Sequence, residues 1–224
     1  MTQRNYRQAF GLKILNSNHA KVRQLKKEGY VAEIHGNKFW NSSFLIMSYL
    51  KKQRIPKKYK VLEIGCKKGF LIQDLQELLP GIKAIGIENH RYPISKASVK
   101  VKNKLYLKNY YDLEKFKRNQ FDLIISNPPY VDQQTMNRLP IEFLKEPQIA
   151  LAGGTEGIDL IQKIIIEAPK YLNANGVLIM EVGRDRKVIE TKFPRINFTW
   201  IETQAGRDFV LFVTREDLRL GLTN

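Results

Sequence analysis

From residue 60 onward, short apolar runs alternate with stretches of helical periodicity, and this alternation most constrains the fold. The runs that we predict as strands are 60–65, 82–88, 104–108, 121–126, 176–182, 197–203 and 208–214. The predicted helices are 69–79, 93–100, 157–171 and 184–193. The last two strands are separated only by 204–207, too short for a crossover helix, so they should pair antiparallel. The pattern predicts an α/β fold whose seven-stranded, mostly parallel sheet ends in an antiparallel hairpin and carries helices on both faces.

The length of the chain predicts one main domain. With 224 residues, of which 43% are hydrophobic, it can bury one substantial core and carry a small appendage. We predict a basic N-terminal extension over 1–37, either a loosely attached arm or a few small helices, and a catalytic domain over 38–224. The apolar spacing over 39–50 predicts an amphipathic helix that leads into the core.

Several classes of protein are disfavoured by composition. No apolar run approaches the length of a membrane span, and the polar start lacks the apolar stretch of a signal peptide, so we expect a cytoplasmic protein without membrane contact. Cys66 is the single cysteine, which excludes an internal disulfide. The histidines at 19, 35 and 90 have no metal-ligand spacing, and we expect no metal.

Positive charge is concentrated near the N-terminus. The net charge is +16, and residues 1–60 hold 14 Lys or Arg against Glu28 and Glu33, a balance of +12. Two clusters, at 21–27 and 51–60, hold most of these cations. Because Lys and Arg make most phosphate contacts, this extension is expected to touch RNA. The alternative is an ordinary solvated basic surface.

The predicted strand 121–126 ends in the sequence Asn127, Pro128, Pro129, Tyr130. The Asn127 side-chain oxygen and the Pro128 carbonyl can each accept one N–H of an NH₂ group, and Tyr130 can cover its flat face. This geometry suits methylation of a planar nitrogen, in a glutamine side chain or an adenine. The alternative is a stiff turn with a packed aromatic ring.

A second motif follows the predicted strand 60–65. Gly65 and Gly69 flank a turn that opens a helix, so that backbone can approach a nucleoside closely. Glu88 ends the next predicted strand, where a carboxylate can accept ribose hydroxyls. Together with the Asn-Pro-Pro-Tyr sequence, this arrangement resembles the S-adenosylmethionine site of class I methyltransferases. The resemblance implies S-adenosylmethionine as the cofactor, with contacts from Glu63, Gly65, Cys66, Gly69, Glu88, Asn109 and Asn127.

Two positions depart from that family. Lys67 stands in the middle of the turn, where the family usually has glycine. It is either a tolerated substitution, with its side chain turned outward or paired with the donor's carboxylate, or the mark of a weakened or lost donor site. Where relatives often place an acidic residue near the adenine, this chain has Asn109, with Asp112 nearby.

The segment after the catalytic turn resembles protein-glutamine methyltransferases that act on release factors and on the large-subunit ribosomal protein L-three. It contains Leu-Pro-x-Glu at 139–142, the pair Glu146-Pro147 and an Ala-Leu-x-Gly-Gly-x-x-Gly loop at 150–157. Nucleic-acid adenine methyltransferases share only Asn-Pro-Pro-Tyr. Two segments, 198–200 and 214–218, resemble the branch acting on the ribosomal protein. The match extends over about 60–218 and fails upstream.

The resemblance implies methyl transfer from S-adenosylmethionine to a glutamine amide, most specifically in L-three. Asn127, Pro128 and Tyr130 would be catalytic, and the substrate would also contact Pro129, Tyr130, Glu146 and Pro147. Two other functions stay open: an RNA or DNA adenine methyltransferase, and a catalytically silent RNA-binding module in which Lys67 blocks the donor. The expected partner is a ribosomal protein or a release factor.

Overall fold

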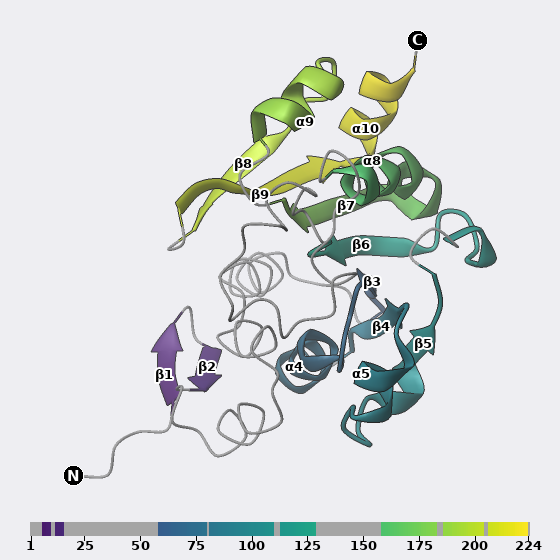
Figure 1. The fold of residues 1–224 in the computed structure, drawn as a ribbon, viewed down its shortest axis with the longest axis vertical. Helices are drawn as coiled ribbons and strands as arrows, with labels where there is room; N and C mark the ends of the chain where they lie inside the picture. Colours follow the sequence, from purple (N-terminus) through teal and green to yellow (C-terminus); the bar gives the residue numbers. More distant parts are fainter. Residues whose placement is uncertain are drawn as a thin grey trace, which may run out of the picture.

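The computed structural model describes residues 6–9, 12–15, 58–79, 81–109, 113–128, 158–182, 186–203 and 206–223. Figure 1 shows a twisted central sheet flanked by helices, with the chain running from the strands near residue 60 to a C-terminal helix. The predicted helix at 39–50 lies outside the described residues.

The central sheet has seven strands in the order β5-β4-β3-β6-β7-β9-β8. Its strands are β3 (Lys60–Ile64), β4 (Lys83–Glu88), β5 (Leu105–Leu107), β6 (Phe121–Ser126), β7 (Leu172–Glu181), β8 (Thr199–Thr203) and β9 (Gly206–Thr214). The pairs β5-β4, β4-β3, β3-β6 and β6-β7 are parallel, whereas β9 runs antiparallel to both β7 and β8. The predicted sheet, including its terminal hairpin, is confirmed.

Helices cover both faces of the sheet because successive strand residues point to opposite sides. In β7, Leu178 and Met180 join one core cluster, whereas Val177 and Ile179 join the other. The first cluster is covered by α8 (Asp159–Tyr171), α9 (Arg186–Lys192) and α10 (Arg215–Leu222), and the second by α4 (Phe70–Leu78). Shorter elements are α5 (Arg91–Ser95), η1 (Lys102–Lys104) and η2 (Leu113–Lys115). The result is a three-layer α/β/α domain (Figure 1).

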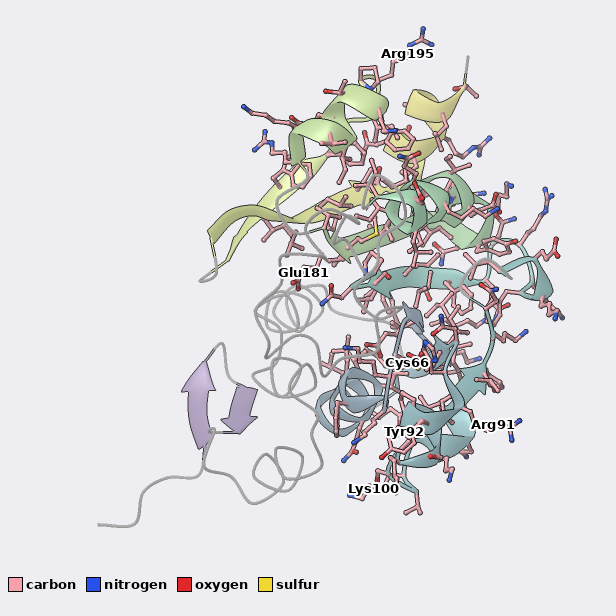
Figure 2. The ribbon with its side chains drawn as sticks, viewed as in Figure 1. Cys66, Arg91, Tyr92, Lys100, Glu181 and Arg195 are labelled. Carbon is pink, nitrogen blue, oxygen red and sulfur yellow. The ribbon has the colours of Figure 1, made fainter. Side chains whose placement is uncertain are left out.

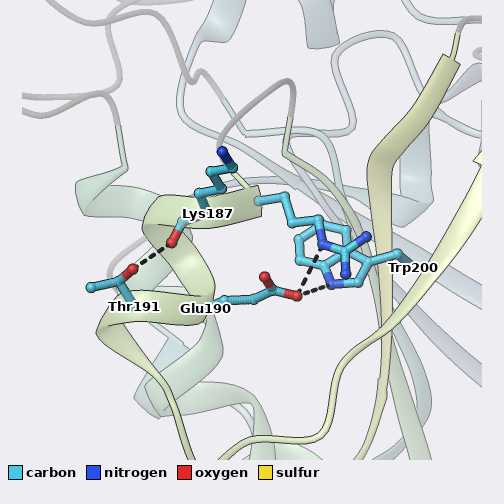
Figure 3. Close-up of polar contacts among 5 residues, drawn as sticks. Lys187, Glu190, Thr191 and Trp200 are labelled. Atoms are coloured by element: carbon cyan, nitrogen blue, oxygen red, sulfur yellow. Dashed lines mark hydrogen bonds and ion pairs between the residues drawn. The ribbon is translucent and has the colours of Figure 1, made fainter.

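Helix α9 is tied to the edge strand β8 by a small polar cluster, shown in Figure 3. The indole N–H of Trp200 donates to Glu190 Oε1 at 2.9 Å, and Nε of Arg186 donates to the same oxygen at 3.0 Å. The Arg186 guanidinium carbon lies 5.2 Å from the centre of the Trp200 ring. Trp200 therefore holds the helix against the sheet, as a packing residue of the last hairpin.

Helix α5 is shorter than predicted. The periodicity predicted 93–100, but the helix spans Arg91–Ser95 and its last turn closes when the Lys96 amide bonds the carbonyls of Tyr92 and Pro93. A turn at Ser98 follows, whose carbonyl accepts the amides of Val101 and Lys102. These local turn bonds replace the helical continuation.

The C-terminal helix α10 was missed. Thr214 caps it, because its side-chain oxygen accepts the Asp217 amide at 3.1 Å, and Leu218 is buried against the core. A threonine followed three residues later by an acidic residue is a helix-start signal, but that stretch was interpreted only as part of a family resemblance. The signal was present in the sequence.

Eight residues of the N-terminal stretch form strands rather than the small helices that were one of its two expected forms. β1 (Tyr6–Ala9) and β2 (Leu12–Leu15) pair antiparallel, with Tyr6 opposite Leu15. These eight residues are not helical, and the alternative of a loosely attached arm stays a prediction. Backbone pairing between two four-residue strands has little periodicity to reveal it.

Candidate active site

The carboxyl ends of β3, β4 and β6 lie side by side at one edge of the sheet. Ile64, near the end of β3, is opposite Ile87 of β4 and Ser126 of β6. The chain runs from β3 to β4 and β5 on one side and then returns to β6 on the other side of β3. Such a reversal point is where open α/β sheets bind ligands.

The turn after β3 is built from backbone bonds to β4. The amides of Gly65 and Cys66 both donate to the Ile87 carbonyl, at 2.9 and 3.0 Å, and the Gly69 amide donates to Cys66 at 2.7 Å. Gly65 and Gly69 have φ angles of 80° and 72°. Only glycine adopts this left-handed backbone without steric cost, so both predicted glycines are required by the turn.

Gly86 lets this turn sit directly on β4. A Cβ at that position would lie 2.5 Å from Cβ and Sγ of Cys66 and 2.6 Å from Cδ1 of Ile72. No side chain fits in that space. The sequence analysis did not single out Gly86, although an isolated glycine inside an apolar strand signals close approach of another segment.

Glu88 is fixed by two backbone donors. Its side chain ends β4 and is only 2% exposed, with Oε2 accepting the Lys67 amide at 3.0 Å and Oε1 accepting the His90 amide at 2.9 Å. Each carboxylate oxygen has a second lone pair for a further donor. The structure therefore holds an oriented acceptor where ribose contacts were predicted.

Lys67 has a left-handed backbone, a conformation that favours glycine. Its φ is 48°, in the left-handed region, and its amide points to Glu88. Its side chain is half-buried. This conformation carries a modest cost for a residue with a Cβ.

Cys66 belongs to the turn, and Glu63 precedes it near the end of β3. Both are buried, at 4% and 3% exposure. Burial raises the pKa of the Cys66 thiol well above its ordinary value, and the charges of Glu63 and Glu88 raise it further. At neutral pH the thiol stays protonated, so Cys66 contributes shape rather than a nucleophile.

Ser126 joins the second motif to the first. Its hydroxyl is buried and donates to the Ile64 carbonyl at 3.1 Å, which ties the end of β6 to the end of β3. Asn127, half-buried, and Pro128, buried, follow at once. The bond holds Asn127 beside the glycine turn. Ser126 was missed, and its signal is a hydroxyl at the end of an apolar strand.

The structure brings most predicted donor contacts to one edge. The Lys108 amide donates to the Glu88 carbonyl at 3.0 Å, which places the exposed Asn109 just beyond the same end of the sheet. The residues that share this edge are Glu63, Gly65, Cys66, Gly69, Glu88, Asn109 and Asn127. The predicted substrate contacts Pro129, Tyr130, Glu146 and Pro147, like Asp112, lie outside the described residues.

Two further polar atoms follow Glu88. In the described part of the chain, Asn89 Oδ1 and His90 Nε2 are buried and have no hydrogen-bond partner. Buried polar atoms rarely stay unsatisfied unless a ligand or water meets them. Neither was identified from the sequence. They add possible ligand contacts to the end of β4.

Two features are absent from the described residues: a membrane-spanning helix and a cluster of metal-binding side chains. None of the helices in the ranges given above is long and apolar enough to cross a membrane. Within those ranges, no three His, Cys, Asp or Glu side chains gather in a way that could hold a metal ion.

Two solved structures with the same fold are methyltransferases. A methyltransferase from Pyrococcus furiosus superimposes with a TM-score of 0.52 at 16% identity, covering 77% of this chain and 82% of that one. The CurJ carbon methyltransferase gives 0.56 at 13% identity, covering 85% and 58%. At such identities the likeness concerns the fold alone, and it confirms the predicted class I methyltransferase architecture.

Curated relatives match a shorter stretch at higher identity. The protein from Neisseria gonorrhoeae is 48% identical over 98 residues, which are 44% of this chain and 33% of the relative. Those from Bordetella pertussis and Francisella tularensis are 46% and 48% identical and cover 33% and 32% of the relatives. All three are named ribosomal protein uL3 glutamine methyltransferase, and the predicted resemblance is confirmed. The chain spans about a third of the length of these relatives.

A family-level match covers most of the edge described above, from Cys66 onward. The sequence model of the family described as Eco57I restriction-modification methylase matches residues 66–184, just over half of the chain. The match begins at Cys66 in the turn after β3, contains Glu88 and Asn127, and ends beyond β7. The chain belongs to the Eco57I restriction-modification methylase family.

Proposed function

We propose that this chain transfers a methyl group from S-adenosylmethionine to the side-chain amide of a glutamine in ribosomal protein uL3. The observation that carries the proposal is the Ser126 to Ile64 bond, which sets Asn127 beside the glycine turn and Glu88. A methyl donor and an amide acceptor would meet at this edge. The named relatives supply the choice of substrate.

The residues of the turn fit the donor. Gly65 and Gly69 give the turn its left-handed backbone, Gly86 lets Cys66 pack against β4, and Glu88 offers two oriented oxygens to ribose hydroxyls. Asn89 Oδ1 and His90 Nε2 have capacity for further bonds within the described residues. When bound, the sulfonium of S-adenosylmethionine supplies an electrophilic methyl group with a good leaving group.

The residues that would bind the acceptor glutamine act by aligning its amide nitrogen with the methyl group. Asn127 Oδ1 and the Pro128 carbonyl each accept one hydrogen of the glutamine NH₂, so the nitrogen is oriented toward the methyl group. Tyr130 covers the plane of the amide, and Pro129, Glu146 and Pro147 contact the surrounding protein substrate, as the family resemblance implies. No base is needed before transfer, and the proton leaves to water afterward.

An adenine in RNA or DNA is the second candidate acceptor. It is favoured by the description of the family as a restriction-modification methylase and by the shared Asn-Pro-Pro-Tyr motif. The glutamine proposal ranks higher because several relatives at 40–48% identity carry that activity in their names.

The N-terminal residues would serve substrate selection. We take 1–37 as a basic extension and 38–224 as the methyltransferase domain; residues 1–60, which include the extension and the start of the domain, carry +12. Ribosomal RNA phosphates would attract this charge, whereas a free basic protein would be repelled. A ribosomal substrate or a release factor would also place the chain in the cytoplasm.

The proposal is tested with the purified full chain in a methyl-transfer assay. Radiolabelled S-adenosylmethionine is offered with uL3, with a release factor and with an adenine-containing oligonucleotide. Label in a glutamine of uL3 supports the proposal, and label in the oligonucleotide alone replaces it with the adenine function. Calorimetric titration with S-adenosylmethionine tests the third function, because a silent module blocked at Lys67 would not bind the donor.

Loss of the chain from cells supplies the second measurement. Mass spectrometry of ribosomal proteins and release factors identifies the glutamine that loses its methyl group. Unchanged methylation of every such protein would refute a translation-apparatus substrate.

A further inference from the structure

A basic surface lies next to the candidate active site and takes no part in it. Between residues 89 and 111 the chain has no Asp or Glu, but it has six cations. They are Arg91, Lys96, Lys100, Lys102, Lys104 and Lys108. This stretch contains α5, η1 and β5, and β5 is an edge strand of the central sheet. Positive charge is therefore concentrated in this part of the chain.

The same stretch exposes aromatic and apolar side chains. Seven large hydrophobic residues among the described ones are exposed, and four of them lie here: Tyr92 at 54%, Val99 at 89%, Tyr106 at 44% and Leu107 at 47%. Both aromatic members of that set, Tyr92 and Tyr106, belong to this surface. Exposed aromatic rings among cations are typical of surfaces that bind nucleic-acid strands.

Contacts within the stretch hold its shape. Lys102 Nζ donates to the Ser95 carbonyl at 3.3 Å, which links η1 to α5. Lys96 Nζ lies 5.7 Å from the centre of the Tyr92 ring. Figure 2 shows Arg91, Tyr92 and Lys100 gathered at one end of the molecule, whereas Arg195 lies at the opposite end.

We propose that this basic-aromatic surface, residues 91–108, binds single-stranded RNA. Arg91, Lys96 and Lys100, all exposed, would contact phosphates, and unpaired bases would stack on Tyr92 and Tyr106. A membrane surface fits less well as the partner, because α5 has only five residues, none of them buried, and is too short to act as an interfacial helix. An acidic protein would match the charge of the cations, but it has no bases to stack on the two exposed tyrosine rings.

The position of the surface links it to the edge described above. Glu88 and His90 immediately precede α5, and β5 pairs with β4. A strand bound along α5 and β5 would therefore reach the ends of the strands where methyl transfer is proposed. The choice of RNA over DNA rests on the proposed ribosomal substrate, whereas binding of a nucleic-acid strand does not.

The electrostatic part is tested by titrating the full chain into a fluorescent twelve-nucleotide RNA at several salt concentrations. The variant R91Q/K96Q/K100Q removes three exposed cations of the surface. The matched control K187Q/K192Q/R195Q removes two lysines and one arginine, also exposed, around α9. The surface variant should bind roughly tenfold more weakly and lose about 2 from the slope of log K against log salt. The control should behave like the unaltered chain.

The aromatic part has its own variants. Tyr92→Ala and Tyr106→Ala should each weaken binding roughly fivefold or more without changing the salt slope, because stacking carries no net charge. Tyr92→Phe and Tyr106→Phe keep the ring and should restore binding. Duplex RNA of equal length should bind several times more weakly than the single strand, because its bases cannot stack on the rings. Thermal unfolding by circular dichroism shows that each variant is folded.

The proposal is overturned if both triple variants lose affinity equally, because any basic patch would then serve. It is also overturned if duplex RNA binds as tightly as the single strand, or if vesicles with anionic lipid capture the chain while RNA does not. The N-terminal extension is present in every variant, so its contribution cancels. Methyl transfer to isolated uL3 is measured separately, and its absence would refute the proposed function without touching the RNA titration.

Discussion

Two regions of the molecule differ in the polarity of the side chains that they bury: the edge formed by β3, β4 and β6, and the interior beneath α8 and α10. Among the described residues, the buried polar or charged side chains are Glu63, Lys68, Glu88 and Ser126, and all lie at that edge or in its turn. The interior beneath α8 and α10 is apolar. Its buried members include Ile161, Ile164, Leu178, Leu211 and Leu218.

This difference indicates which region serves function. Burying a polar group costs free energy unless hydrogen bonds replace those to water, whereas aliphatic burial stabilises by about 25 cal/mol per Å². The edge also holds the left-handed Lys67, although glycine would be less strained there. A chain selected for stability alone would not place these features together, and they coincide with the predicted donor contacts.

The largest effect should come from the apolar interior. Leu211, in β9, is fully buried in the apolar cluster that α8, α9 and α10 cover, so Leu211→Ala removes packed methyl groups and leaves a cavity. We expect a loss of about 2–5 kcal/mol in the free energy of unfolding. Urea denaturation measures it, and calorimetry below the transition should find donor affinity unchanged. Weaker donor binding in the folded variant would break the division between the two regions.

Asn127→Ala should lower activity and leave stability unchanged, the reverse of what is expected for Leu211→Ala. Loss of an oriented acceptor for the glutamine NH₂ should slow methyl transfer on the order of 100-fold or more. Donor affinity should change little, because the six other predicted donor contacts remain, and stability should stay near that of the unaltered chain, since Asn127 is only half-buried. Asn197→Ala changes an exposed asparagine between α9 and β8 and is the control. Near-normal turnover by Asn127→Ala would remove the catalytic role.

Glu88→Ala should affect both properties, because Glu88 belongs to the edge but also accepts two backbone amides. Loss of the charged acceptor should weaken S-adenosylmethionine binding by about 1.5–3 kcal/mol. Stability should fall as the Lys67 and His90 amides lose their partner. The exposed Glu114→Ala is the matched control. A variant that loses stability but binds the donor normally would show that Glu88 only supports the turn.

Lys67→Gly should have the smallest effect. Glycine relieves the left-handed backbone at φ 48°, worth at most about 1 kcal/mol, and should leave donor binding unchanged or tighter. Lys67→Ala keeps the strain and removes the charge, which separates the two contributions. If both variants bind the donor severalfold more weakly, the ammonium group pairs with the donor's carboxylate and Lys67 is a positive contributor.

The central elements were predictable because their signals are local. The apolar run 121–126 coincides with β6, and the four-residue gap before the last strand indicated the antiparallel hairpin. The glycine turn and Glu88 were also predicted, since each follows a strand in a short recognisable motif. Local turn bonds shortened α5, and the cap at Thr214 that starts α10 was overlooked.

The sequence by itself determined the alternation of strands and helices and the residue types that gather at their ends. Only the tertiary structure decided how those ends meet. The Ser126 hydroxyl reaches the Ile64 carbonyl across 62 positions of the chain, and Gly86 admits Cys66 because β3 and β4 pair in one particular register. Periodicity records which face of a strand is buried, but pairing between distant strands depends on the combined packing of both faces of the sheet.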